Sequence, residues 1–234
     1  MSLPVINTPT YELVVPSTKE KLVYRPFLVK EEKILLMAME DGNEDNIIRS
    51  VRTIVNNCTF EKLDIHSLAM FDLEYIFLRV RAKSVGEVVT VNLLSPDDNK
   101  TYVKVDIDLE SVEVKFDKKH KNKIKLTDEI ILEMSYPNLD LLSASGDLGQ
   151  ADQIFGMIGQ CVERIYDGET IYERADFTQK ELDVFLESLN TKQFEEVQEF
   201  FNTMPKISHD VEFTNPKTKK KHKITLEGMQ SFFE

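Results

Sequence analysis

The sequence lacks the features that mark most secreted, membrane-spanning and disulfide-stabilised proteins. It has only two cysteines, Cys58 and Cys161, and both lie in segments of helical pattern, so we expect buried thiols in a reducing compartment. The longest apolar run, residues 34–39, is far shorter than the roughly 20 residues that a membrane-spanning helix needs. The first four residues show neither the basic nor the apolar region of a signal peptide. These absences predict a cytoplasmic protein.

The sequence also lacks a catalytic signature. It contains no Walker loop, dinucleotide fingerprint, nucleophile elbow or zinc-protease HExxH pair. Its four histidines are scattered, whereas metal ligands come at short paired spacings; they are His66, His120, His209 and His222. The 41 acidic residues guarantee chance carboxylate pairs, and no pair stands out. We therefore predict that the protein is not an enzyme and has no catalytic residue, no cofactor and no metal site.

Positive charge is in the minority. Asp and Glu number 41 against 29 Lys and Arg, which gives a formal net charge of −12 and disfavours general nucleic-acid binding. Two basic clusters, Lys118–Lys125 and Lys217–Lys223, stand out against this background. No aromatic residues are interleaved among the lysines to stack on bases. Solvated turns are favoured over a site for an acidic partner, although the two clusters together could make one positive patch.

What the sequence does contain is one short unit that appears three times. Each copy has an apolar extended run, a polar turn led by proline, and a second extended run; the copies span residues 11–24, 88–107 and 211–226. β-branched alternation broken by turn-forming residues predicts a β-hairpin in each case. Internal duplication and coincidence are both open explanations.

Helices are expected on either side of the middle hairpin. The first runs from about Lys30 to Gly42, with Met37 among its apolar positions, and the second starts at about Glu44. The third, residues 71–85, is apolar nearly all round, which predicts that it forms the centre of the N-terminal core.

The second half mixes strand and helix patterns. Strands are expected at 112–116 and 130–134, and an apolar helical spacing runs from Ile154 to Ile165. A capping box at 178–181 opens one further helix, and another begins at Thr191. The fold class is therefore α+β: a helical N-terminal part, a central antiparallel sheet of hairpins, and a helical C-terminal part closed by a hairpin. We predict domains at 1–137 and 150–234, with a linker at 138–149.

The last hairpin and the tail carry two unusual features. Residues 213–219 have the shape of a zinc knuckle with Asn215 and Thr218 in place of cysteines, so either a formerly metal-binding hairpin now holds without metal, or this is an ordinary Asn-Pro turn. The tail ends in two large apolar side chains, Phe232 and Phe233. Docking onto the chain's own core and insertion into a partner are the two interpretations.

Several segments resemble the baseplate hub assembly proteins of T4-type tailed bacteriophages. They are residues 3–13, 24–33, 71–75, 81–86 and 222–228, so the likeness extends over most of the chain. The resemblance implies a non-enzymatic protein that helps to build the baseplate hub, beside the tape-measure protein. Some relatives carry cysteines in the final hairpin where this chain has Asn215 and Thr218, which puts a metal role in doubt here.

These observations favour an assembly chaperone that binds the hub or tape-measure protein in the host cytoplasm. A permanent subunit of the baseplate hub, found in the virion baseplate, is the alternative, and a hairpin-based nucleic-acid-binding protein ranks third. Candidate partner-binding residues are Arg25, Phe27, Phe232 and Phe233.

Overall fold

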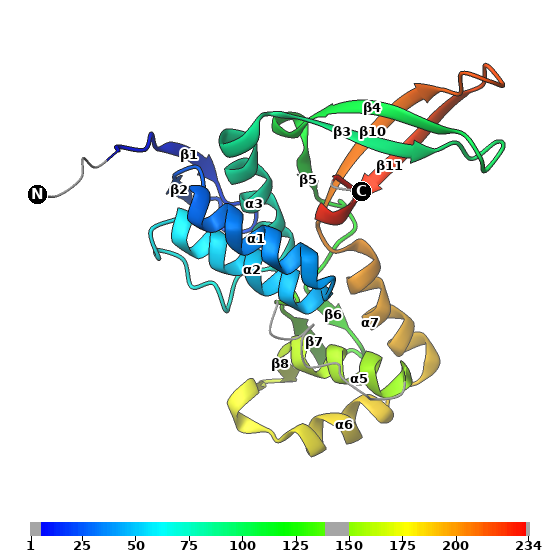
Figure 1. Cartoon of the computed structure of the whole chain (residues 1–234). Coiled ribbons are helices and arrows are strands. Elements are labelled where there is room, and N and C mark those ends of the chain that lie inside the picture. The colour runs from blue at the N-terminus through cyan, green and yellow to red at the C-terminus, as the bar shows by residue number, and fades with distance from the viewer. Residues whose placement is uncertain (1–5, 139–149, 233–234) are drawn as a thin grey trace, which may run out of the picture. The chain divides into compact units, whose positions relative to one another are not determined.

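The structure is a computed structural model that describes residues 6–138 and 150–232. It shows the predicted α+β class, with helices and small antiparallel sheets (Figure 1). The contacts divide the chain into two compact units, one of residues 1–115 with 206–234 and one of residues 116–205. The predicted linker lies, apart from its first residue, outside the described residues.

The units differ from the predicted domains of 1–137 and 150–234 because of strand pairing. Strand β10 (Lys206–Thr214) pairs with β11 (Lys221–Glu227) and also with β5 (Glu113–Lys115). The last hairpin is thereby joined to the N-terminal residues, and the second unit is an insertion between β5 and β10.

Three helices form much of the first unit: α1 (Val29–Asp41), α2 (Glu44–Cys58) and α3 (Met70–Val85). Helix α1 ends as predicted at Gly42, which adopts a left-handed φ of 65° and donates its N–H to the Met39 carbonyl at 3.2 Å. Helix α3 is the predicted core helix, since its side chains are buried on most sides. Those buried are Phe71, Asp72, Leu73, Ile76, Phe77, Leu78, Val80 and Ala82.

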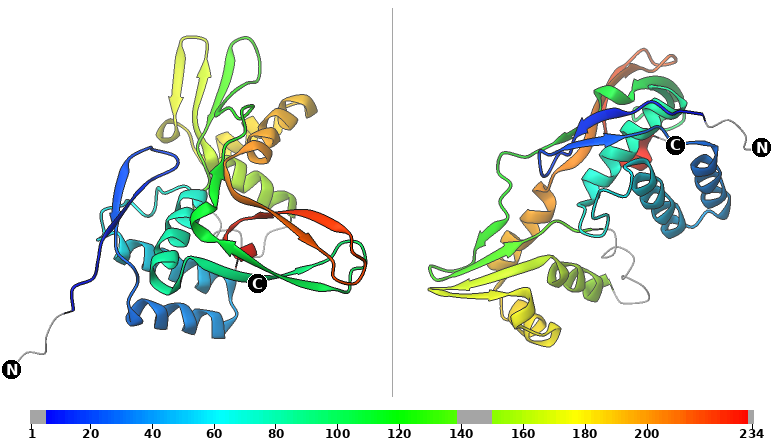
Figure 2. Two further views of the ribbon diagram at one scale, coloured as in Figure 1. Left: turned by 90° about the horizontal axis from the view of Figure 1, so that it is seen from above. Right: turned by 90° about the vertical axis from the view of Figure 1, so that its left-hand side faces the viewer.

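All three predicted hairpins are confirmed, and all belong to the first unit. They are β1 (Tyr11–Val14) with β2 (Lys21–Tyr24), β3 (Val88–Leu94) with β4 (Tyr102–Asp108), and β10 with β11. The second and third hairpins lie side by side and reach their turns together (Figures 1 and 2).

The three turns share one backbone conformation. In each, the residue before the proline is buried, and the residue four positions further on has a left-handed φ and donates its N–H to the carbonyl of that buried residue. The pairs are Lys19 (φ 61°) to Val15 at 2.9 Å, Asn99 (φ 51°) to Ser95 at 3.0 Å, and Lys219 (φ 63°) to Asn215 at 2.9 Å. The repeated sequence unit is therefore also a repeated structural unit.

The second unit packs helices against an antiparallel sheet of order β6-β7-β8-β9. The strands are β6 (Lys123–Lys125), β7 (Ile130–Met134), β8 (Val162–Asp167) and β9 (Thr170–Glu173), and the helices are α5 (Gln150–Cys161), α6 (Gln179–Glu187) and α7 (Thr191–Thr203). The core includes Leu132 from the sheet, Ile158 from α5, Leu182 from α6 and Phe200 from α7. No helix among the described residues is long and apolar enough to cross a membrane.

Two local predictions in this unit are wrong. The helix predicted from Ile154 to Ile165 ends at Cys161, and Ile165 lies in β8 opposite Leu132 of β7. Strand pairing with β7 and β9 overrides the helical spacing there. Part of the basic cluster Lys118–Lys125 is also strand rather than turn, because Ile124 contributes to the core. The predicted capping box at Thr178 and Glu181 is confirmed.

Candidate interaction site

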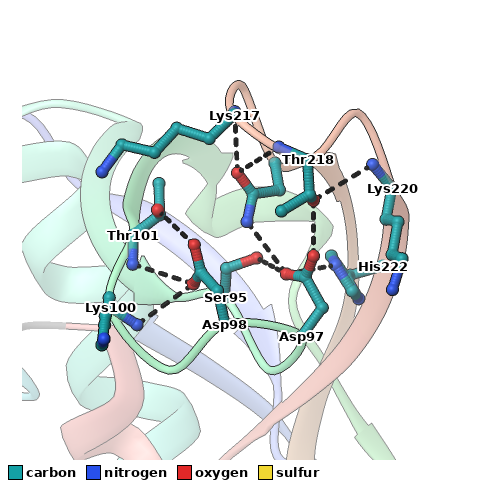
Figure 3. A network of polar contacts seen from close by, with 10 residues as sticks. Ser95, Asp97, Asp98, Lys100, Thr101, Lys217, Thr218, Lys220 and His222 are labelled. Atoms are coloured by element: carbon teal, nitrogen blue, oxygen red, sulfur yellow. Dashed lines mark hydrogen bonds and ion pairs between the residues drawn. The ribbon is translucent and has the colours of Figure 1, made fainter.

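A network of polar side chains lies where the second and third hairpins turn. Asp97, in the β3–β4 turn, accepts hydrogen bonds from the hydroxyl of Ser95 at 2.8 Å, from the side-chain amide of Asn215 at 2.9 Å, and from the hydroxyl of Thr218 (Figure 3). The Nε2 atom of His222 lies 3.0 Å from the same carboxylate. Since Asn215, Thr218 and His222 belong to the β10–β11 hairpin, Asp97 fastens two hairpins together. We call this set of five residues the clasp.

The clasp strongly favours the ionised form of Asp97. Its side chain is only 6% exposed. The hydrogen bonds from Thr218, Asn215 and Ser95, with the nearby His222, hold the pKa of this carboxyl well below its usual range, although partial burial works in the opposite direction. A carboxylate that accepts several hydrogen bonds is therefore the centre of the junction.

Asn215 fits the clasp because an amide both donates and accepts. While its Nδ2 donates to Asp97, its Oδ1 accepts the backbone N–H groups of Lys217 at 2.9 Å and Thr218 at 3.3 Å. The residue is fully buried. An aspartate here would place a second carboxylate against Asp97 and lose the donor.

Asp98 stabilises the β3–β4 turn by accepting hydrogen bonds within it, as Asn215 does in the β10–β11 turn. Its carboxylate accepts the backbone N–H groups of Lys100 at 3.1 Å and Thr101 at 3.0 Å, and the Thr101 hydroxyl at 2.6 Å. These bonds, chiefly those from Thr101, hold the pKa of Asp98 below its usual range. Each turn thus contains one side chain that accepts hydrogen bonds within the turn, Asp98 or Asn215, and Asp97 joins the two turns to each other.

The knuckle positions Asn215 and Thr218 therefore serve hydrogen bonding. Zinc in proteins is bound by thiolates, imidazoles and carboxylates, and the clasp offers mainly hydroxyl and amide groups around one carboxylate and one imidazole. No group of three or more His, Cys, Asp or Glu side chains in the described part of the chain is arranged to hold a metal ion. The donor set does not fit zinc.

A second surface feature is a set of exposed apolar side chains on α1, which stand among exposed charged ones. Val29, Leu36, Met37 and Met39 are 79%, 54%, 59% and 54% exposed. Met37, one of the apolar positions expected in this helix, is thus exposed. Methionine side chains are flexible and polarizable, and they suit surfaces that adapt to a partner. The sequence did not predict this exposure, because these apolar residues belong to the same apolar run that predicts the helix.

Arg25 and Phe27 lie in the segment that leads into α1. The Arg25 guanidinium forms an ion pair with Glu31 at 2.9 Å, and the Arg25 backbone N–H donates to the Cys58 carbonyl at 2.9 Å. The Arg25 side chain is 12% exposed and that of Glu31 is fully buried. The Phe27 N–H donates to the Ser84 hydroxyl at 2.9 Å. Both residues thus have contacts within their own unit, and partner binding through them stays a prediction.

The tail returns to the first unit. Phe232 lies in the 3-10 helix Met229–Phe232 and is 1% exposed, and the N–H of Met229 donates to the half-buried Glu74 of α3 at 3.2 Å. Docking onto the chain's own core therefore describes Phe232 in this structure. Phe233 lies outside the described residues.

The fold and the clasp define a two-unit α+β protein whose main polar site fastens its own backbone. A model of the family described as T4 bacteriophage base plate protein matches residues 8–234. The chain belongs to this family of phage baseplate proteins. Comparisons with curated proteins and with solved structures gave no match. The family predicted from the sequence segments is thus confirmed at the level of the baseplate.

Proposed function

We propose that this chain is a non-enzymatic assembly factor for the baseplate hub of a contractile-tailed phage. It acts as a chaperone that binds the hub or tape-measure protein in the infected cell. The observation that carries the proposal is the family match over residues 8–234, which includes both compact units and so makes the whole fold that of a baseplate protein.

The non-enzymatic part is supported by the roles of the titratable groups. Burial raises the pKa of the Cys58 thiol to about 11 and that of Cys161 to about 12, which makes both poor nucleophiles at neutral pH. Asp97 and Glu31, two carboxylates with lowered pKa, are engaged in the clasp and in the ion pair with Arg25. Each group has a structural explanation.

Transient binding is supported by the exposed apolar side chains of α1. An adaptable methionine-containing surface suits a partner that is engaged and then released. A permanent hub subunit, the alternative, requires a large and more apolar interface. The net charge of −12 favours the solubility of such a factor while these apolar side chains are exposed.

The test is quantitative mass spectrometry of a tagged copy, recovered from infected cells and compared with purified virions. Enrichment with hub or tape-measure protein in cells, together with absence from virions, is expected for a chaperone. A fixed copy number per virion would make the chain a structural subunit instead. An untagged infection controls for background, and enrichment with neither protein would overturn the proposal.

A further inference from the structure

The paired turns of the second and third hairpins present lysines outward. Lys100 stands on the first turn, and Lys217, Lys219, Lys220 and Lys221 stand on the second; all five are exposed. In Figure 3 the side chain of Lys217 extends away from Asp97, and that of Lys220 runs along the outer side of His222. Within the described residues none of the five takes part in an ion pair, whereas Lys223, further along β11, pairs with Asp210. We call these five residues the lysine tip.

The acidic residues of the same turns do not neutralise this surface by direct pairing. Asp97 is nearly buried in the clasp, and Asp98 accepts bonds from the backbone and hydroxyl of its own turn. Both carboxylates are used to hold the turns, while the ammonium groups remain in solvent. An otherwise acidic chain thus carries a cationic surface at the turns of these two hairpins.

The clasp also fixes the spacing of the lysines. Without it, two long hairpins would move independently at their turns, and Lys100 would have no set distance from the lysines of the other hairpin. The bonds from Asp97 to Asn215 and Thr218 remove that freedom before any partner arrives. Preorganisation of this kind lowers the entropic cost of binding.

We propose that the lysine tip is a docking surface for an acidic segment of a partner protein. This inference deepens the proposed function, because it assigns a surface and a charge to the assembly partner. Clustered carboxylates on the partner would contact the ammonium groups of both turns at once. The surface would therefore select partners by their charge and increase the rate at which they associate.

A polypeptide fits the tip better than a nucleic acid does. Neither turn, residues 95–101 or 215–221, contains an aromatic side chain on which a base could stack. A phosphate backbone of any length would also meet the repulsion of a chain with net charge −12. An acidic segment of a protein can be short enough to contact the lysine tip alone, so that it avoids repulsion from the rest of the acidic chain.

Fluorescence anisotropy with a labelled oligoglutamate peptide and the full chain tests this at low ionic strength. K217E/K219E/K221E should weaken binding by about tenfold or more, since several charge pairs become repulsions. K118E/K119E/K121E makes the same change in charge on exposed lysines of the second unit and should leave binding unchanged. Equal losses in both variants, or none in either, would overturn the proposal, as would tighter binding of oligothymidylate than of the peptide.

Asp97→Asn separates preorganisation from charge. The substitution makes the tip more positive but weakens the clasp, so a fixed lysine spacing predicts binding weakened by about threefold. Tighter binding would overturn the role of the clasp. Near-ultraviolet circular dichroism confirms that each variant is folded.

Recovery of tagged K217E/K219E/K221E from infected cells distinguishes this inference from the proposed function. Undiminished enrichment of hub or tape-measure protein would overturn the lysine tip while the proposed function stands. Loss of that enrichment, with K118E/K119E/K121E unaffected, supports both. If the unaltered chain enriches neither protein, the proposed function fails, and the peptide measurement alone decides the inference.

Discussion

The carboxylate of Asp97 and the side-chain amide of Asn215 are 118 residues apart in the sequence and 2.9 Å apart in the structure. This bond, with those from Thr218 and Ser95, joins two hairpins at their turns. The two turns thereby share one polar network, centred on a carboxylate, although they belong to different hairpins.

Asp97→Asn should loosen the turns, because an amide cannot accept all the bonds that the carboxylate accepts. We expect faster hydrogen exchange at the amides of Asn99 and Lys219, whose bonds close the two turns. Exchange measured by mass spectrometry or NMR checks this, with exposed Glu212→Gln on β10 as the control. Unchanged exchange at both amides would show that the backbone alone holds the turns.

The same carboxylate predicts an acid dependence of stability. Its folded pKa lies below the unfolded value of about 3.9, so the stabilisation is fully present above about pH 4 and is lost as the pH falls towards the folded pKa. The free energy of unfolding of the unaltered chain, measured with denaturant, should therefore fall more steeply below about pH 4 than that of Asp97→Asn. The same pH dependence of the unfolding free energy in both proteins would contradict this.

Breaking the ion pair between Arg25 and Glu31 should be strongly destabilising. Burial alone would raise the pKa of Glu31, but the bonds from Arg25 and from the Leu28 N–H hold it below its usual range. Arg25→Met removes the main partner of a buried carboxylate, which then keeps the exposed Lys30 ammonium at 3.3 Å and the Leu28 N–H, and should cost up to about 3–5 kcal/mol of unfolding free energy. The double variant R25M/E31L should recover much of that loss. A similar loss in both variants would point to packing instead of charge.

How far the sequence predicts this structure depends on the range of the interactions involved. The hairpins and the capping box at Thr178 follow from residues within a few positions of one another, and each is confirmed. Ile165 was misassigned because the choice between helix and strand there is made by pairing with β7, which is distant in sequence. The clasp is likewise non-local: Asn215 was noted as a knuckle position, but its partner Asp97 carries no local signal. Only folding brings the two turns together.

Both cysteines should resist modification in the native protein. Burial raises the pKa of the Cys58 thiol to about 11 and that of Cys161 to about 12, so little thiolate exists at neutral pH. Ellman's reagent should react slowly with the folded chain. After denaturation it should react with both thiols. Lys180→Cys, at an exposed site on α6, supplies a fast-reacting control. Rapid reaction without the added cysteine would show that one of the two thiols is accessible.

His120 should make the second unit sensitive to acid. Its ring packs against those of Tyr136 and Phe200 with centroid distances of 5.5 Å and 5.0 Å, and its Nδ1 lies 3.1 Å from the Thr203 hydroxyl. Burial lowers its pKa despite the nearby Asp117, so the neutral ring is favoured in the folded state.

The sign of this effect follows from proton binding. Below the unfolded pKa of about 6.5 the unfolded chain binds more protons than the folded one, so stability falls as the pH decreases. His120→Phe keeps an aromatic ring in this position and should flatten that dependence. Hydrogen exchange of α7 amides between about pH 5 and 7 checks it, and an unchanged pH dependence in the variant would exclude His120 as the cause.

Phe232→Ala distinguishes a core residue from a partner-binding one. Because Phe232 is 1% exposed, its truncation should leave a cavity and lower the free energy of unfolding by about 3–5 kcal/mol. Val88→Ala, at a 59% exposed position of the same unit, should cost little. If Phe232 instead inserted into a partner, the variant would keep its stability in isolation and lose its co-purifying proteins. Denaturant unfolding and recovery from infected cells, measured on the same variant, separate these outcomes, and we expect the loss to appear first in stability.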